Sequence, residues 1–237
     1  MVNILISILV AIDLGLGLYL LNVHYVIDII AGLMAGVAVF YVLSKKMAAT
    51  LTAIVEKANK LAMKKNLDGA IEVLKEGYKY RWRHPFVKSQ LDAQIGVLYY
   101  YKKDYDNAFP YLKKGIATHY IAKGMLAVIY YKKKQYDKMQ ETFEIAVKSA
   151  SKESLIWALY AYCMNKIGKR EKAIEIINRG LKKIPGDERL LANLKALQNR
   201  RPMKMKAYGE MWYQFMLDKM PVIQQQPPKF ARFKRRY

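Results

Sequence analysis

The chain has 237 residues, of which 41 are Lys or Arg and 19 are Asp or Glu, giving a formal net charge of +22. Hydrophobic residues make up 53% of it, which excludes a wholly disordered protein. The single cysteine, Cys163, excludes an internal disulfide framework and a cysteine-ligated zinc site. Residues 1–44 contain no Lys, Arg or Glu, so the positive charge belongs to the remaining chain, which is long enough to bury a core.

Two apolar stretches open the chain, at residues 2–21 and 25–43. Each has about 20 residues, and an α-helix of that length spans about 30 Å, the thickness of a bilayer core. We therefore expect residues 1–44 to form a transmembrane helical hairpin. A secretory signal peptide is the competing interpretation, but it requires a cationic start that this segment lacks.

The positions of the lysines predict the orientation of this hairpin. Lys45 and Lys46 follow the second apolar stretch, whereas the turn between the two stretches has no cation. Because cytoplasmic segments carry an excess of Lys and Arg, we expect a bacterial-type inner-membrane protein with two spans and with both termini and the body in the cytoplasm. The basic body also favours contact with anionic membrane lipid.

Four residues of the hairpin are candidates for contacts within the membrane. Asp13 lies in the middle of the first stretch, where an ionised carboxylate costs about 3 kcal/mol, so it is either partner-facing or protonated. In the second case Asp28, which is nearer the turn, would reach the interface. Gly32 and Gly36 form a G-x-x-x-G pattern, typical of close helix packing. This face packs either the two helices of the hairpin or a second membrane protein or copy of the chain.

The body contains a repeated pattern, in which a short polar turn precedes a small or slim residue that opens an apolar helix. These anchor residues are Ala70, Ala108, Met139 and Ala173, with spacings of 38, 31 and 34 residues. Small residues recur twelve positions before and seven positions after each anchor, which allows two helices to approach closely. We expect an all-α fold in which four antiparallel helix pairs form an α-solenoid.

The expected organisation places repeat units near residues 51–83, 88–120, 121–152 and 154–186 of a solenoid that covers residues 45–200. A capping helix at residues 187–200 follows, with Asp187 as its N-cap. No Gly or Pro interrupts residues 37–65. We therefore expect the second membrane helix to continue into the first repeat helix.

This pattern resembles the tetratricopeptide repeat (TPR) family, whose period is 34 residues. The matching residues are Trp157, Ala161, Gly168, Ala173, Gly180 and Pro185 in the fourth unit, Ile95, Gly96 and Tyr99 in the second, and Tyr130, Tyr136, Phe143 and Ala146 in the third. The first and third units depart from the pattern, with Trp82 and Ser151 in place of proline. The resemblance implies a membrane-anchored TPR protein, in which the repeats bind other proteins.

Ligands of the TPR family lie in a concave groove lined by the first helix of each pair. Transfer of these positions predicts a groove that suits a peptide or helix with apolar and acidic side chains. The predicted groove residues are Asn59, Val97, Tyr100, Tyr101, Val128, Tyr131, Lys132, Tyr162, Asn165 and Lys166. Only Asn59 and Lys166 lie near the positions of the family's carboxylate clamp, so chaperone tails are not the expected ligand.

Residues 201–237 form a basic tail. An amphipathic helix is predicted from the spacing of Tyr208, Met211, Trp212 and Phe215. Three placements remain open for this helix: it packs on the solenoid, lies on the bilayer, or binds a partner or the groove. A Gln- and Pro-rich linker then leads to a basic end, whose interaction candidates are Arg232, Lys234, Arg235 and Arg236.

The sequence has no Gly-rich phosphate loop, nucleophile elbow or metal-ligand cluster, so we expect neither an enzyme nor a bound cofactor. The favoured function is a membrane-anchored scaffold or adaptor that binds protein partners during assembly or regulation of a membrane-associated complex. One alternative is a basic membrane tether for nucleic acid or ribosomes, which is weakened by the lack of a nucleic-acid-binding motif. The other is a non-catalytic subunit of a membrane enzyme complex.

Overall fold

The structure is a computed structural model that describes residues 1–20 and 25–219. These residues form helices and contain no β-strand, so the expected all-α class with two long apolar N-terminal helices is confirmed. The α-helices are α1 (Val2–Leu20), α2 (Tyr25–Met63), α3 (Leu67–Glu76), α4 (Val87–Tyr101), α5 (Tyr105–Lys114), α6 (Tyr120–Lys132), α7 (Tyr136–Ser149), α8 (Ser154–Lys166), α9 (Arg170–Lys183), α10 (Glu188–Gln198) and α11 (Glu210–Tyr213). Two short 3-10 helices are η1 (Gly77–Tyr80) and η2 (Met205–Tyr208).

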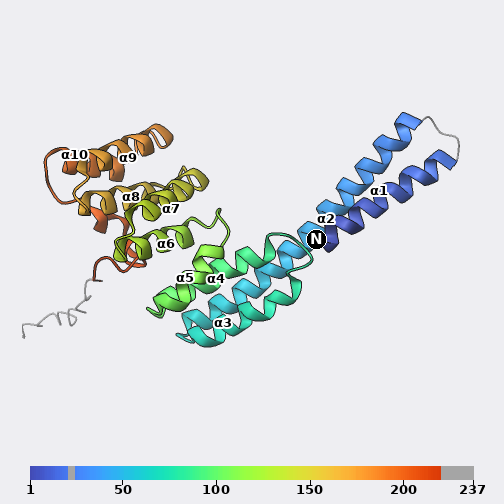
Figure 1. The fold of residues 1–237 in the computed structure, drawn as a ribbon, viewed down its shortest axis with the longest axis horizontal. Coiled ribbons are helices and arrows are strands. Elements are labelled where there is room, and N and C mark those ends of the chain that lie inside the picture. The colour runs from blue at the N-terminus through green and yellow to red at the C-terminus, as the bar shows by residue number, and fades with distance from the viewer. Residues whose placement is uncertain (21–24, 220–237) are drawn as a thin grey trace, which may run out of the picture.

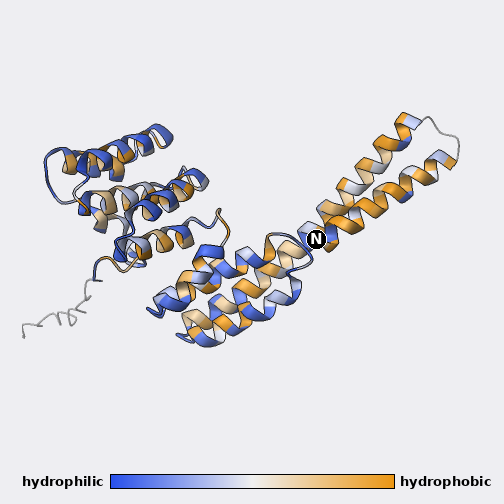
Figure 2. Ribbon diagram, viewed as in Figure 1, coloured by the Kyte–Doolittle hydropathy of each residue, from blue (hydrophilic) through white to orange (hydrophobic). Residues whose placement is uncertain are grey.

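Helix α2 is the longest of these elements, with 39 residues. Its first part packs on α1 and its last part packs on α3, so a single helix belongs to both the apolar hairpin and the body (Figure 1). Figure 2 shows that apolar residues dominate where α2 pairs with α1 and that polar residues appear where it enters the body. The expected continuous helix is confirmed, because no Gly or Pro follows Gly36 within it.

The body consists of consecutive helices that pack in pairs. Helix α2 packs on α3, α4 on α5, α6 on α7 and α8 on α9, while α10 contacts both helices of the last pair. The first helices of neighbouring pairs also touch, α4 with α6 and α6 with α8. These contacts leave the first helices side by side along one face of the body (Figure 1).

The same turn joins the two helices of every pair. Its middle residue adopts a positive φ, which is 61° at Lys65, 62° at Lys103, 56° at Lys134 and 83° at Gly168. In the second pair, the N–H of Lys103 donates to the carbonyl three residues earlier and the next N–H donates to the carbonyl five residues earlier, at 2.9 and 3.1 Å. This Schellman arrangement satisfies carbonyl groups that the helix end leaves free.

The residues that open the second helix of each pair are packed against the first helix. Ala70, Ala108, Met139 and Ala173 all have an exposed fraction of 0%. On the first helix of the second pair, a Cβ added at Gly96 would lie 2.8 Å from the backbone N of Leu112 on the partner helix, so a larger residue would not fit there. The spacing of the four anchor residues in the sequence therefore reflects the points where the two helices of each pair touch.

Helix α10 closes the last pair as expected. The Asp187 carboxylate accepts a hydrogen bond from the N–H of Leu190 at 2.8 Å, which is an N-cap contact. Leu190 and Leu197 are buried against α8 and α9, while Leu191 remains exposed. The cap thus covers the apolar face of the final pair.

The positive φ in the turns allows a test of this arrangement. We expect Lys134→Gly to raise the free energy of unfolding by up to about 1 kcal/mol, because glycine has no Cβ to clash in the left-handed region. The adjacent Lys133 has a φ of −80°, so Lys133→Gly should lower stability through the entropy of the unfolded chain. Urea unfolding of the detergent-solubilised chain, followed by circular dichroism, measures both changes. If both substitutions changed the free energy of unfolding in the same direction, the left-handed conformation of Lys134 would be contradicted.

Candidate functional site

Helices α1 and α2 form an apolar hairpin whose outer surface is open. Both helices are long and apolar enough to cross a membrane, yet only 11% and 17% of the residues in their most apolar windows are buried. Leu9, Leu33 and Val37 are among the exposed side chains. The core helix of a water-soluble protein would bury such residues, whereas a lipid-facing helix exposes them.

The G-x-x-x-G face of α2 holds the hairpin together. A Cβ added at Gly32 would lie 2.5 Å from the carbonyl oxygen of Ala11, and one at Gly36 would lie 2.9 Å from that of Ser7. Both glycines are therefore covered by α1 and are not available to a second protein or a second copy. The interpretation of Gly32 and Gly36 as an external membrane contact is wrong, because the hairpin itself uses this face.

The two acidic residues of the hairpin have opposite environments. Asp28 lies one and two turns before the glycines on the same face of α2, so its carboxylate points between the helices. It is 3% exposed, and neither of its side-chain oxygens has a hydrogen-bond partner among the described residues. Asp28 therefore does not extend to the interface as one interpretation expected. Asp13 is exposed on α1, where a partner could still contact it.

The predicted partner groove is occupied by a segment of the chain itself. Residues 203–218, which we call the C-terminal segment, follow α10 and return along the first helices of the last three pairs. Met205, Trp212 and Phe215 are at most 2% exposed and belong to the same apolar core as α4, α6 and α8. Of the three placements considered for this region, the groove is the one that the structure shows.

Tyr100 and Gly124 receive the end of this segment. The Tyr100 hydroxyl donates a hydrogen bond of 2.6 Å to the carbonyl oxygen of Phe215. A Cβ added at Gly124 on α6 would lie 2.9 Å from the Phe215 ring, so glycine makes room for that ring. Burial raises the pKa of Tyr100, which keeps its hydroxyl protonated as the donor.

Trp212 anchors the middle of the segment. Its ring meets the ring of Tyr162 edge to face, with centroids 4.8 Å apart, and its indole N–H donates to Asp218 at 2.9 Å. Burial, together with the Asp218 carboxylate, raises the pKa of Tyr162 to about 12. At the exposed edge, the Tyr101 hydroxyl donates to the side-chain oxygen of Gln214 at 3.2 Å. The segment is thus bound by backbone, aromatic and polar contacts.

The predicted amphipathic helix over this segment is wrong. The structure has η2 and the one-turn helix α11, separated by Gly209 with φ 59° and ψ −142°. This conformation interrupts the helix and lets Tyr208 and Trp212 both face the body. Met211 is 45% exposed on the other side. The predicted tail residues Arg232, Lys234, Arg235 and Arg236 lie outside the described residues.

The remaining predicted groove residues divide into three groups. Val97 and Val128 are buried in the core, whereas Tyr131 is half-buried and packs against the same core. The Lys132 ammonium donates to the Tyr105 hydroxyl at 3.0 Å and lies 4.4 Å from the centre of its ring. Asn59 is exposed on α2, in the first helix pair. Tyr100 is itself 0% exposed, so the groove is much less open than its sequence pattern indicated.

Asn165 and Lys166 line a cavity of about 450 Å³ where the C-terminal segment begins. Most of its other polar lining is cationic, and the single carboxylate is that of Asp218, which already accepts from Trp212. The cationic lining residues are Lys166, Arg170, Arg200 and Arg201. An acidic side chain of a ligand would be stabilised here by several positive charges.

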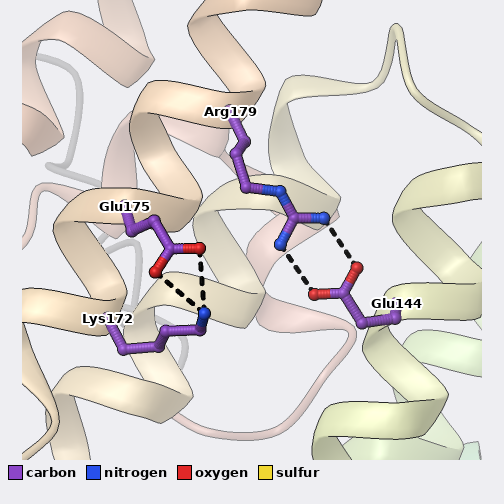
Figure 3. Close-up of polar contacts among 4 residues, drawn as sticks. All are labelled: Glu144, Lys172, Glu175 and Arg179. Atoms are coloured by element: carbon purple, nitrogen blue, oxygen red, sulfur yellow. Dashed lines mark hydrogen bonds and ion pairs between the residues drawn. The ribbon is translucent and has the colours of Figure 1, made fainter.

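An ion pair joins the last two helix pairs and lies near a second ion pair within α9 (Figure 3). Arg179 on α9 binds both carboxylate oxygens of Glu144 on α7, at 2.8 and 2.6 Å, and lies 5.5 Å from the centre of the Trp157 ring. These hydrogen bonds lower the pKa of Glu144. Lys172 pairs with Glu175 on the same helix at 2.8 Å. Glu144 is therefore engaged in holding α7 against α9.

The described residues do not assemble a metal site, since no group of three or more His, Cys, Asp or Glu side chains converges among them. The thiol of Cys163 is fully buried, and burial raises its pKa, which makes it a poor nucleophile. What the structure brings together on the groove face is aromatic rings, hydroxyl groups and cations. This combination suits the binding of a polypeptide segment.

Several residues of the occupied groove were not found from the sequence. Gly124, Gln214 and Asp218 contact or belong to the segment, but none is part of a regular motif. Gly124 could have been found, because a glycine on the groove face of a repeat helix indicates close approach by another part of the chain. Asp218 had no such signal in the sequence, because it comes close to its partner Trp212 only when the segment turns back on itself.

Phe215→Ala should release the C-terminal segment without unfolding the helix pairs. Loss of a fully buried Phe side chain costs about 3–5 kcal/mol, more than a short irregular segment can recover elsewhere. We expect the amides of residues 205–218 to lose protection in hydrogen–deuterium exchange, while those of α6 and α8 keep theirs. Met211→Ala is the matched control, because Met211 is exposed in the same segment. Equal protection in both variants would contradict the observed packing.

Neither a family model nor a curated protein matches this chain. The helical hairpin and the occupied groove are therefore the features from which its function is inferred.

Proposed function

We propose that this chain is a membrane-anchored TPR-type adaptor that binds a segment of a protein partner in the groove along α4, α6 and α8. The observation that carries the proposal is that the groove already holds a segment of the chain itself, residues 203–218. A surface that binds one polypeptide segment through Tyr100, Tyr101 and Tyr162 has the chemistry to bind another. The C-terminal segment then competes with the partner.

The contacts of the C-terminal segment indicate what the partner segment requires. An aromatic side chain would replace Phe215 under Gly124, and a second would replace Trp212 against Tyr162. An acidic group would reach the cavity lined by Lys166, Arg170 and Arg200. The expected partner segment is therefore aromatic and acidic, and it binds in an extended or short-turn conformation rather than as a long helix.

The helix pairing supports the TPR assignment. Four equivalent turns with positive φ occur at the spacing of the anchor residues, and the first helices of neighbouring pairs line one face. A solenoid of helix pairs presents such a face as an extended concave surface. The C-terminal segment and α10 then act as the end of the solenoid.

The hairpin supports an anchor with a defined orientation. Two apolar helices of membrane length precede Lys45 and Lys46 on α2, and the body behind them is basic. Under the positive-inside rule the body faces the cytoplasm of a bacterial inner membrane, and both ends of the chain lie on that side. The adaptor would hold its partner beside the anionic leaflet.

Site-specific photocrosslinking in native membranes tests the proposal. A benzophenone amino acid replaces Tyr101, which is 37% exposed and bonded to Gln214 in the occupied groove. We expect adducts within the chain in the unaltered background. In the Phe215→Ala background we expect fewer of these and several-fold more adducts to a discrete partner protein. The matched probe replaces Lys138, an exposed residue of α7 outside the groove. It should give the same adducts with and without Phe215→Ala.

The alternatives give different products. Adducts to RNA or DNA that are lost with increasing salt would favour the nucleic-acid tether. A protein adduct that is equally strong with and without Phe215→Ala would contradict binding in the groove. A third probe in place of Asp13 tests the remaining alternative. An adduct from this probe to a large membrane subunit, without a protein adduct from the Tyr101 probe, would favour the role of a non-catalytic subunit.

A further inference from the structure

The loop between η1 and α4 is fixed at the end of the apolar hairpin. The N–H groups of Val2 and Asn3 on α1 donate to the carbonyl oxygens of Trp82 and Arg83, at 2.8 and 3.3 Å. The ring of His84 stacks on Phe40 of α2, with centroids 6.1 Å apart. Both helices of the hairpin therefore hold this loop at the level where the apolar surface stops and Lys45 begins the basic body.

This loop combines exposed aromatic rings with cations. Trp82 and Phe86 are 62% and 57% exposed, although the other two tryptophans of the chain, Trp157 and Trp212, are buried. Arg81 and Arg83 are exposed beside them, and the Arg81 guanidinium lies 5.3 Å from the centre of the Trp82 ring. An amphipathic tryptophan ring with neighbouring cations is typical of the headgroup region of a bilayer, and the apolar Phe86 ring lies close to it in the chain.

No carboxylate opposes these cations from within the loop. Residues 77–91 contain no Asp or Glu. The next acid in the chain, Asp92, is buried, accepts a hydrogen bond from the Tyr78 hydroxyl and lies 3.9 Å from the ammonium of Lys88. Lys45 and Lys46 add positive charge from the exposed surface of α2. The end of the hairpin therefore has an unneutralised positive surface.

A cleft of about 490 Å³ opens beside the loop, between α2 and the start of α4. Its lining is mainly apolar and comes from elements on both sides of the junction. The lining includes Tyr41, Met47, Leu51, Phe86, Val87 and Ile116. Lys45 and Ser44 also line it, and the Ser44 hydroxyl has no hydrogen-bond partner among the described residues. An amphiphile with an anionic head and an apolar chain matches both parts of this surface.

We propose that the loop and the cleft form a binding site for an anionic phospholipid of the leaflet that the body faces. Arg81, Arg83 and Lys45 contact the phosphate and the anionic headgroup, while Trp82 and Phe86 enter the interface. An acyl chain of the same lipid lies in the cleft. A free phosphate ion would leave the cleft and the exposed rings unused, so the lipid is the occupant that fits. This site goes beyond the proposed function because it needs no protein partner.

The site has a consequence for the position of the body. Two helices that cross a bilayer can tilt within it, and the body tilts with them because α2 is continuous; a third contact beside the helices restricts that tilt. The loop belongs to the connection from the first to the second helix pair. Lipid bound there would hold the first two helix pairs of the body against the membrane surface.

Quenching of Trp82 fluorescence by brominated lipids measures this binding directly. The full chain is reconstituted in vesicles of phosphatidylcholine and phosphatidylglycerol in which either one or the other lipid carries bromine. Trp157 and Trp212 are 3% and 0% exposed inside the body, and the chain with Trp82→Phe provides their unquenched background. We expect brominated phosphatidylglycerol to quench Trp82 several-fold more effectively than brominated phosphatidylcholine at equal content.

Arg81→Gln combined with Arg83→Gln should abolish most of this preference, because each cation beside an anionic surface contributes roughly a fivefold factor. The matched control is Lys138→Gln with Lys152→Gln, which removes the same charge from exposed positions in the last half of the body. It should leave the preference unchanged. Equal quenching by the two lipids, or a preference that survives loss of both arginines, would overturn the proposal.

Discussion

Continuity of α2 is the constraint on which the rest of the structure depends. One helix of 39 residues supplies half of the apolar hairpin and the first helix of the body, without a breaker between them. A helix kinks sharply only where Pro, Gly, a π-bulge or an inserted group disturbs its hydrogen bonds, so this element transmits its direction from one part to the other. The loop carbonyls of Trp82 and Arg83, which accept from the start of α1, add a second connection at the same junction.

The occupied groove changes how partner binding must be described. A ligand that enters the groove has to displace Trp212 and Phe215, both of which are fully buried. The apparent affinity of the proposed partner would then be lowered by the fraction of molecules whose groove is closed. The bound segment also covers the aromatic groove, which would otherwise expose a large apolar patch. Groove residues such as Tyr100 therefore stabilise the resting chain as well as defining the proposed binding surface.

Much of the fold could be predicted from the sequence because it depends on local signals. The anchors such as Ala108 are small where two helices touch, and the lack of Gly or Pro in residues 37–65 predicts one continuous helix. The role of Gly32 and Gly36 could not be decided, because the same spacing serves a hairpin and an intermolecular contact. Only the positions of Ala11 and Ser7 show that α1 covers them.

The candidate site was predicted less completely, for a physical reason. A spacing of i, i+3 and i+4 indicates an amphipathic helix only when every intervening residue is helical. Gly209 leaves that conformation, so Trp212 and Phe215 reach the groove through an irregular turn instead. The groove residues could be located by the repeat, but their burial under residues 203–218 depends on contacts between distant parts of the chain. The basic loop at Trp82 has no periodic pattern. Its role as a candidate lipid site could be inferred only from its position beside the start of α1.

The distance between spin labels at positions 41 and 59 tests the central claim most directly. Both side chains are exposed on α2, on opposite sides of the junction, and the buried Cys163 would be replaced by Ala to avoid labelling. An unbroken helix separates the two backbone positions by about 27 Å, from a rise of 1.5 Å per residue. In lipid vesicles the account predicts one narrow distance distribution that is consistent with this separation. A broad distribution, or one centred at a much shorter distance, would show that the helix breaks at the membrane surface and would contradict the account.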